Sequence, residues 1–247
     1  LKFLIIFFLG AFVMRSAGCI VNDIFDRNID KKVDRTKLRP LASSQITLTK
    51  AIILLLILSA MGLYVLINLN PPAIILGLVI APLIVLYPLA KRFFIIPQLV
   101  LAMIYNWGSI IGWVTIQSPY KFDNILILYS ALIIWTIIYD TIYATQDEMD
   151  DRKMKLYSSV IFFDSKRFQI INFLICLKYA LLCFFAYSLN YHFIFYVLII
   201  SVFIVNLLDI HMKWKNLSQN ALGYFKRNNH YALLILFSIM IGSQLNV

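Results

Sequence analysis

Long apolar runs separated by short polar gaps make up most of this chain. Each run is close to the 20 or so residues that an α-helix needs to cross the hydrocarbon core of a bilayer. The pattern therefore predicts an all-α, multi-span transmembrane helical bundle that forms a single domain over residues 1–247. The eight predicted spans are 1–24, 48–69, 72–90, 96–117, 122–146, 168–189, 191–209 and 229–246.

The composition agrees with an integral membrane protein. Hydrophobic residues make up 62% of the chain and charged residues only 14%, which excludes an ordinary water-soluble domain. The formal net charge is +10, but the basic residues lie in the gaps between apolar runs and not in a soluble basic domain, so nucleic acid is excluded as a partner. The expected surroundings are the lipid bilayer. The three cysteines lack the paired spacing of a disulfide framework or a zinc site.

The basic residues alternate between the two sides of the predicted bundle. Most of the Lys and Arg residues fall in every second gap, whereas the other gaps hold only Lys121. By the positive-inside rule, the basic gaps are cytoplasmic, or face the matrix in a mitochondrion. The regular alternation supports the count of eight helices. The basic gaps are 27–50, 91–95, 147–167 and 210–228.

Acidic residues are concentrated in two short segments, which hold nine of the 12 in the chain. In the first segment, Asp23, Asp26 and Asp30 have the i, i+3, i+7 spacing that places them on one face, if the helix continues through them. Asn22 precedes them directly. In the second segment, Tyr143, Asp147 and Asp151 follow at i, i+4, i+8, and Asp140 lies one heptad before Asp147. We expect one acidic face in each segment.

Such clustering at the end of an apolar helix is unfavourable unless a cation compensates the carboxylates. Oxygen ligands without His or Cys favour a hard ion, and Mg²⁺ usually shares its coordination shell with phosphates of a substrate. Both segments are predicted at cytoplasmic helix ends, so we expect them to face one cavity and to hold a diphosphate through Mg²⁺. The predicted metal ligands are Asn22, Asp23, Asp26, Asp30, Asp147 and Asp151.

Basic and aromatic residues near the acidic segments complete the predicted site. Arginine and lysine are suited to binding phosphate oxygens, whereas most other loop charges are expected to be solvated. Tyrosine rings in phase with the second acidic face can stabilise a carbocation. Arg15 either contacts a substrate anion or pairs with Asp23 or Asp26. The predicted diphosphate contacts are Arg35, Arg39, Lys91, Arg92 and Lys155, and the predicted cavity residues are Arg15, Asn106, Tyr139, Asp140 and Tyr143.

Two blocks of the sequence resemble the UbiA superfamily of intramembrane aromatic prenyltransferases. They are GAFVMRSAGCIVNDIFDRNID at 10–30, continued by RTKLRPLAS at 35–43, and WTIIYDTIYATQDEMDD at 135–151. The blocks are most similar to the 4-hydroxybenzoate polyprenyltransferase branch. The resemblance implies nine helices around a central cavity, of which this chain is expected to lack the first. Lys155 stands where the branch usually has Gly, and Tyr157 where it usually has Lys.

The resemblance also implies a mechanism. A Mg²⁺-assisted ionisation of a polyprenyl diphosphate is followed by attack of an aromatic acid, 4-hydroxybenzoate, through the ring carbon ortho to its hydroxyl. The product implied is 3-polyprenyl-4-hydroxybenzoate, a ubiquinone precursor, made in a bacterial or mitochondrial inner membrane. Asp23, Asp26, Asp147 and Asp151 are the catalytic residues in this interpretation.

Three alternatives stay open at the level of sequence. The acceptor can be that of another branch, such as dihydroxynaphthoate, homogentisate, haem or a lipid alcohol. A cation transporter would also use intramembrane carboxylates, although it predicts them near the bilayer midplane and not beside Arg and Lys at helix ends. The third alternative is an inactive remnant, against which the intact acidic motifs argue.

Overall fold

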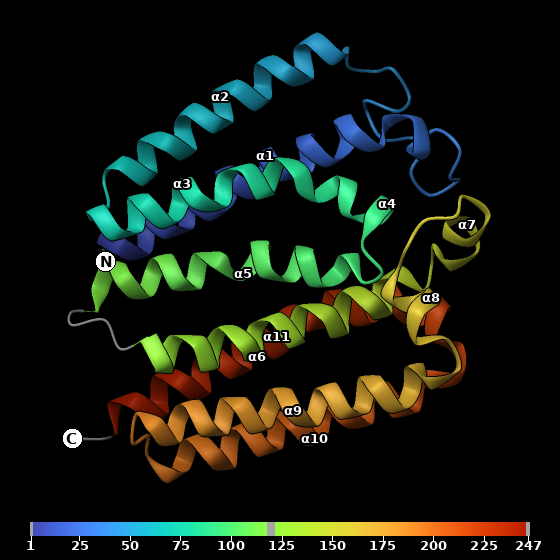
Figure 1. Cartoon of the computed structure of the whole chain (residues 1–247). Coiled ribbons are helices and arrows are strands. Elements are labelled where there is room, and N and C mark those ends of the chain that lie inside the picture. The colour runs from blue at the N-terminus through green and yellow to red at the C-terminus, as the bar shows by residue number, and fades with distance from the viewer. Residues whose placement is uncertain (1, 118–121, 246–247) are drawn as a thin grey trace. The chain divides into compact units, whose positions relative to one another are not determined.

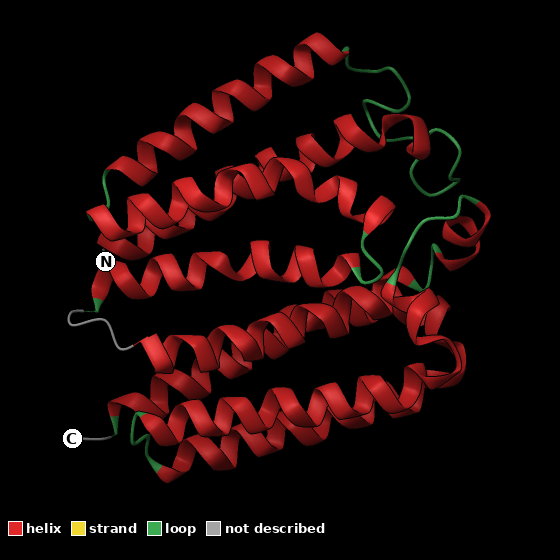
Figure 2. Ribbon diagram, in the orientation of Figure 1, coloured by secondary structure: helices red, strands yellow, loops and turns green. Residues whose placement is uncertain are grey.

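The computed structural model describes residues 2–117 and 122–245, and within them the chain forms helices, turns and loops without a strand (Figure 2). This confirms the all-α prediction. Lys121 and the predicted helix ends at residues 1 and 246 lie outside the described residues. The long helices of the described part are α1 (Lys2–Asp30), α2 (Leu48–Ile67), α3 (Pro71–Leu86), α5 (Pro97–Ile116), α6 (Phe122–Ala144), α9 (Arg167–Ser188), α10 (Phe193–Lys213) and α11 (Leu217–Gln244) (Figure 1).

Short helical elements join the long helices at several points. They are η1 (Tyr87–Leu89), α4 (Ala90–Phe93), α7 (Glu148–Lys153), α8 (Ser159–Phe163), η2 (Asp164–Lys166) and η3 (Trp214–Asn216). Within the described ranges, seven helical segments are long and apolar enough to span a membrane. The last of them, Phe193–Gln244, is 52 residues long and contains both α10 and α11. The presence of several such segments confirms the predicted multi-span helical bundle.

Several helices extend beyond the apolar runs that predicted them. α1 continues to Asp30 and not to residue 24, so the first acidic segment is helical throughout. The stretch 210–228 was predicted as a loop, but the end of α10, η3 and the first part of α11 occupy it, and that prediction was wrong. Hydropathy marks the part of a helix that matches the hydrocarbon core, whereas a helix can extend into the polar region without apolar residues.

The chain divides into two compact units, which are described separately. The first consists of Leu1–Ala90 and Trp107–Tyr120, and the second of Lys91–Asn106 and Lys121–Val247. In the first unit, α1 packs against α2 and η1, and α2 packs against α3. Caps define the starts of α2 and α3: the Thr47 side chain accepts a hydrogen bond from the backbone of Lys50, and Asn70 accepts one from Ala73. The single domain and its central cavity stay predictions.

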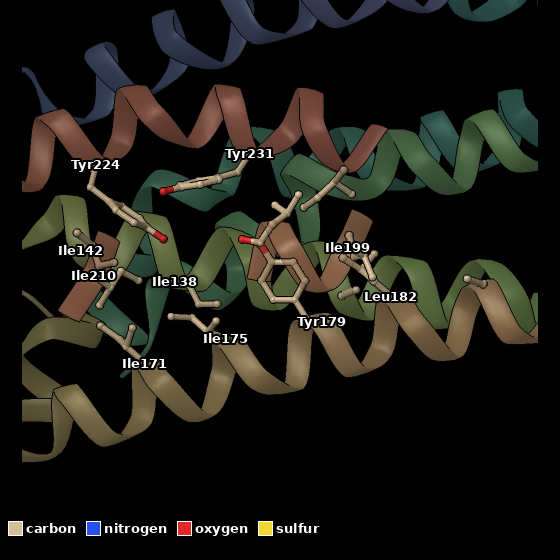
Figure 3. Packing of buried hydrophobic residues seen from close by; sticks show 14 of the residues in the cluster. Ile138, Ile142, Ile171, Ile175, Tyr179, Leu182, Ile199, Ile210, Tyr224 and Tyr231 are labelled. Atoms are coloured by element: carbon tan, nitrogen blue, oxygen red, sulfur yellow. The ribbon is translucent and has the colours of Figure 1, made fainter. Parts of the chain in front are cut away.

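The core of the second unit lies between α6, α9, α10 and α11 (Figure 3). Isoleucines from three of these helices, among them Ile138, Ile175 and Ile199, are fully buried there. Lys178 is also buried in this core; its Nζ donates to Asn206 Oδ1 at 3.4 Å and lies 4.1 Å from the centre of the Tyr179 ring. A polar contact therefore joins α9 to α10 within this apolar core.

Candidate functional site

The first acidic segment lies at the end of α1, with its carboxylates on the predicted face. Asp26 and Asp30 are 4% and 5% exposed, whereas Asn22 and Asp23 are half-buried. Because α1 continues to Asp30, the condition attached to the i, i+3, i+7 spacing is met. The sequence pattern thus placed these side chains correctly along one helix.

Arg39 joins two of the predicted metal ligands. Its Nη1 donates to Asp23 Oδ1 at 3.1 Å and to Asp30 Oδ2 at 3.0 Å. The loop after α1 folds back to bring Arg39 there, since the Thr36 hydroxyl donates to the carbonyl of Asp30 and Leu41 is buried. One positive charge therefore compensates two carboxylates that would otherwise repel each other.

Asn22 has a partner that sequence reasoning missed. The Tyr87 hydroxyl, in η1, donates to Asn22 Oδ1 at 3.1 Å. Tyr87 lies in the block YPLAKRF at 87–93, which carries the basic pair Lys91 and Arg92, but nothing in its spacing pointed to Asn22. The contact orients the Asn22 amide at the start of the acidic segment.

The second acidic segment does not follow the predicted continuous helix. α6 ends at Ala144, two residues before the predicted end, and α7 begins at Glu148. Backbone N–H groups of Thr145 and Asp147 donate to carbonyls three residues back, at 3.2 and 3.0 Å, and such tight bonds end an α-helix. Asp147 is the residue before α7, and its carbonyl accepts from the backbone of Asp151 at 2.8 Å. The continuous helix that the i, i+4, i+8 spacing implied is therefore wrong, whereas the single acidic face stays a prediction.

The backbone at the end of α7 has a conformation that favours glycine at position 155, where this chain has lysine. Lys155 has a positive φ of 55°, its N–H donates to the carbonyl of Arg152, and the N–H of Leu156 donates to the carbonyl of Asp151. This pair of bonds is the Schellman ending of a helix, whose left-handed residue is usually glycine. Lys155 is exposed, so its charge points away from the packed turn.

A buried polar cluster holds the chain after α7. Gln98 of α5 donates to the Ser158 hydroxyl at 3.3 Å and accepts from the backbone of Ser159 at 2.9 Å. The Ser159 hydroxyl in turn bonds the Thr141 hydroxyl of α6 at 2.7 Å. These side chains are all nearly inaccessible, and hydrogen bonds in such surroundings are costly to lose. Nothing in the residue pattern indicated this cluster.

The same stretch carries the predicted basic residues of α4 close to the second acidic segment. The backbone N–H of Tyr157 donates to the carbonyl of Lys91 at 2.9 Å. Lys91 is half-buried and Arg92 is exposed. This bond joins α4 to the stretch that follows α7, whereas the role of Lys91 and Arg92 in diphosphate binding stays a prediction.

The two predicted cavity tyrosines share an aromatic neighbour that was not predicted. The ring of Phe225 in α11 lies 5.7 Å from that of Tyr139 and 4.8 Å from that of Tyr143, measured between ring centres. Asp140, between them in sequence, is half-buried. The rings of Tyr139, Tyr143 and Phe225 therefore form one aromatic group, and both tyrosines precede Asp147 in the sequence.

Three other predicted site residues differ in their surroundings: Asn106 forms a hydrogen bond between two helices, whereas Arg15 and Arg35 lie at the surface. Asn106 directs its amide to Thr136 Oγ1 at 2.8 Å, joining α5 to α6. Arg15 and Arg35 are exposed. Both interpretations of Arg15, as a contact of a substrate anion or as a partner of Asp23 or Asp26, stay predictions.

The acidic segments carry the donor chemistry of the predicted metal but do not complete a metal site. Within the described ranges, no group of three or more His, Cys, Asp or Glu side chains is gathered closely enough to hold a metal ion. The side chains of each acidic segment nevertheless offer oxygen atoms alone, which are the ligands that Mg²⁺ prefers. The residue types fit Mg²⁺ provided that other oxygen atoms, such as those of water or substrate phosphates, complete its shell.

Comparisons with known proteins decide the family. The sequence model of the UbiA prenyltransferase family matches residues 1–230. This chain belongs to the UbiA prenyltransferase family. The resemblance carried by the two motif blocks is therefore confirmed, and membership of a prenyltransferase family counts against the cation transporter.

Curated members of the UbiA family share up to half of their aligned residues with this chain. The mitochondrial 4-hydroxybenzoate polyprenyltransferase of Drosophila melanogaster is 47% identical over 154 residues, which cover 62% of this chain and 39% of that protein. The 4-hydroxybenzoate octaprenyltransferase of Francisella tularensis is 38% identical over 244 residues, which cover 98% of this chain and 84% of that protein. The match thus spans about two fifths of the fly protein's length.

Solved structures of UbiA homologues share the fold. The apo structure of a homologue from Aeropyrum pernix K1 has a TM-score of 0.83 at 24% identity and covers 96% of this chain and 88% of that one. A homologue from Archaeoglobus fulgidus bound to GPP and Mg²⁺ has a TM-score of 0.72 at 18% identity and covers 97% of this chain and 87% of that one. At these identities, the likeness concerns the fold.

Proposed function

We propose that this UbiA family member transfers a polyprenyl group from a polyprenyl diphosphate to 4-hydroxybenzoate. The carbon–oxygen bond to diphosphate breaks and diphosphate leaves, the new carbon–carbon bond forms at the ring carbon ortho to the hydroxyl, and that carbon releases its proton. The match to the Francisella octaprenyltransferase over 98% of this chain is the observation that carries the proposal, because it includes both acidic segments.

The residues proposed to hold Mg²⁺ are Asn22, Asp23, Asp26 and Asp30 of the first segment, with Asp147 and Asp151 of the second. The Archaeoglobus homologue, which is bound to GPP and Mg²⁺, supports a divalent ion together with a prenyl diphosphate. When bound, Mg²⁺ would neutralise charge that develops on the leaving diphosphate. Oxygen-only donors in both segments fit this role.

The basic residues are proposed to bind the diphosphate. Arg39 is the best supported, because its guanidinium already contacts Asp23 and Asp30 at 3.1 and 3.0 Å. A planar guanidinium can exchange carboxylate oxygens for phosphate oxygens without changing its bonding geometry. Arg35, Lys91, Arg92 and Lys155 are proposed to add positive charge around it.

The aromatic group around Phe225 is proposed to face the reacting carbon. Tyr139 and Tyr143 pack on Phe225, so the three rings support one another's orientation. Their π faces can stabilise the allylic cation that forms when the diphosphate leaves, and their apolar bodies exclude water that would capture it. Arg15, Asn106 and Asp140 are proposed to line the same cavity.

The protein is an integral membrane protein, since it carries several apolar helices of spanning length in its described part. We propose a bacterial or mitochondrial inner membrane, with both acidic segments facing the cytoplasm or the matrix. The Drosophila and Francisella relatives, from a mitochondrion and a bacterium, support either setting.

The test is a transfer assay in membranes that contain this chain. A polyprenyl diphosphate and labelled 4-hydroxybenzoate should give a lipid-soluble product with Mg²⁺ and none with a chelator. Parallel reactions with dihydroxynaphthoate and homogentisate control for the acceptor. Product from another acceptor alone would contradict the proposed substrate, and no product from any acceptor would contradict the proposed enzyme.

A further inference from the structure

Arginines hold both carboxylate oxygens of Glu148, the first residue of α7. Arg152 donates to Oε1 through Nε at 3.2 Å and through Nη2 at 2.9 Å. Arg167 donates to Oε2 through Nη2 at 2.9 Å. A carboxylate held at both oxygens by charge-assisted bonds has its orientation fixed. Glu148 therefore connects the acidic segment to the arginines around it.

The two arginines continue to the elements that follow α7. Arg167, the first residue of α9, also donates to the carbonyl of Val160 in α8 at 3.0 Å. Arg152 also donates to Asp164 Oδ1, at the end of α8, at 3.1 Å. We call Glu148, Arg152, Asp164 and Arg167 the arginine anchor; it joins α7, α8 and α9.

Burial separates the strong contact of the arginine anchor from the weak ones. The side chains of Arg167 and Glu148 are 17% and 23% exposed, whereas those of Arg152 and Asp164 are 46% and 68% exposed. Exposed ion pairs contribute little to stability because water screens them. The pair between Arg167 and Glu148 is therefore expected to do most of the anchoring.

The anchor matters because α7 has only six residues. Isolated helices of that length are unstable in water, so contacts with the rest of the protein must fix its position. The Schellman turn at Lys155 fixes its last turn. At its first turn, the anchoring residue Glu148 directly follows Asp147 and lies three residues before Asp151, which is about one helical turn.

We propose that Arg167, acting through Glu148, is a positioning residue that holds Asp147 and Asp151 in place for a magnesium-bound prenyl diphosphate. The proposal rests on the proposed function, in which these two aspartates are metal ligands. Residues that orient metal ligands typically change metal affinity about 10- to 100-fold when they are removed.

Hydrogen exchange of the full chain without metal tests the anchoring directly. In Arg167→Gln, the amides of residues 147–156 should exchange about tenfold faster than in the wild type, because local opening becomes easier. Arg167→Lys should lie between the two, since it keeps the charge. Lys153→Gln is the matched control: it also removes one positive charge, from α7 itself, but the Lys153 side chain is 71% exposed and its contact with Asp150 is long, at 3.7 Å. Unchanged exchange in Arg167→Gln would overturn the proposal.

A magnesium titration of geranyl diphosphate binding tests the link to the site. The Mg²⁺ concentration at half-maximal binding should rise about tenfold in Arg167→Gln, in Glu148→Gln and in the double variant alike, because all three lose the ion pair between Arg167 and Glu148, which is expected to do most of the anchoring. Additive losses, or no shift in variants whose exchange is faster, would overturn the link. If the wild type itself shows no magnesium-dependent binding, the proposed function fails, and the exchange experiment still decides the anchoring.

Discussion

The two acidic segments present similar residues on different local structures. The first lies on one uninterrupted helix, α1, and Arg39 from the following loop joins Asp23 to Asp30. The second is divided by the turn between α6 and α7, and the arginine anchor holds its short helix. Carboxylate spacing alone therefore does not determine how such a segment is folded. The arginine contacts differ as well: one arginine, Arg39, bridges two carboxylates of the first segment, whereas two arginines, Arg152 and Arg167, bind the single carboxylate of Glu148 in the second.

Replacing one aspartate in each segment should have the largest effect. Asp26→Asn and Asp147→Asn each remove a proposed ligand charge at nearly constant volume, and each should lower turnover by about 100-fold or more. The transfer assay measures this loss, and circular dichroism controls for folding. If only one of the variants loses activity, the two segments are not equivalent in function and the comparison fails.

A methyl group added at a glycine should destabilise the second unit, at Gly242, more than the first unit, at Gly62. A Cβ at Gly242 would lie 2.6 Å from the Cβ of Phe195, which cannot move without its backbone. Gly242→Ala should therefore destabilise the protein by about 1–3 kcal/mol. At Gly62 a Cβ would lie 2.5 Å from the sulfur of Met14, which is the flexible end of a side chain, so Gly62→Ala should cost much less.

Thermal unfolding in detergent measures both glycine variants. The Gly242→Ala transition should occur at a clearly lower temperature than that of Gly62→Ala. Equal transitions would show that the contact between α10 and α11 adapts as readily as that between α1 and α2.

Arg39→Gln should weaken binding of the prenyl diphosphate about tenfold, because it loses a guanidinium charge that already contacts the first segment. The Michaelis constant for the diphosphate is the measurement. Lys37→Gln is the control, since Lys37 pairs with Asp34, whose side chain is 96% exposed. Equal changes in the two variants would mean that general loop charge, and not the position of Arg39, determines binding.

The smallest effect is expected at Lys155. Lys155→Gly should stabilise the turn after α7 by about 1 kcal/mol, because glycine adopts the observed φ of 55° without a steric penalty. Lys155→Ala removes the same charge but keeps the strained backbone, so the difference between the two variants isolates the backbone effect. A higher unfolding temperature for Lys155→Ala than for Lys155→Gly would contradict this account.

Sequence reasoning predicted those features that depend on residues close together in the chain. Apolar runs located the long helices, and the spacing of Asp23, Asp26 and Asp30 identified their common face. The same reasoning failed at Asp147, because hydrogen bonds in the turn after Ala144 replaced the continuous helix. Helical spacing cannot reveal such a break.

Contacts between residues far apart in the chain could not be predicted from the spacing of residues in the sequence. Phe225 lies more than 80 positions from Tyr139, and Gln98 lies 60 positions from Ser158. A single sequence contains many Phe and Gln residues with similar neighbours, and only tertiary packing selects among them. Glu148 illustrates the limit, because nothing in its spacing indicated the two arginines that bind it.

The central claim is that both acidic segments serve one magnesium-bound prenyl diphosphate. Electron paramagnetic resonance can count Mn²⁺ bound to the full chain with and without geranyl diphosphate. The account predicts that geranyl diphosphate increases Mn²⁺ binding by the wild type, and that Asp26→Asn and Asp147→Asn each abolish this increase. An increase of wild-type size in either variant would contradict the claim.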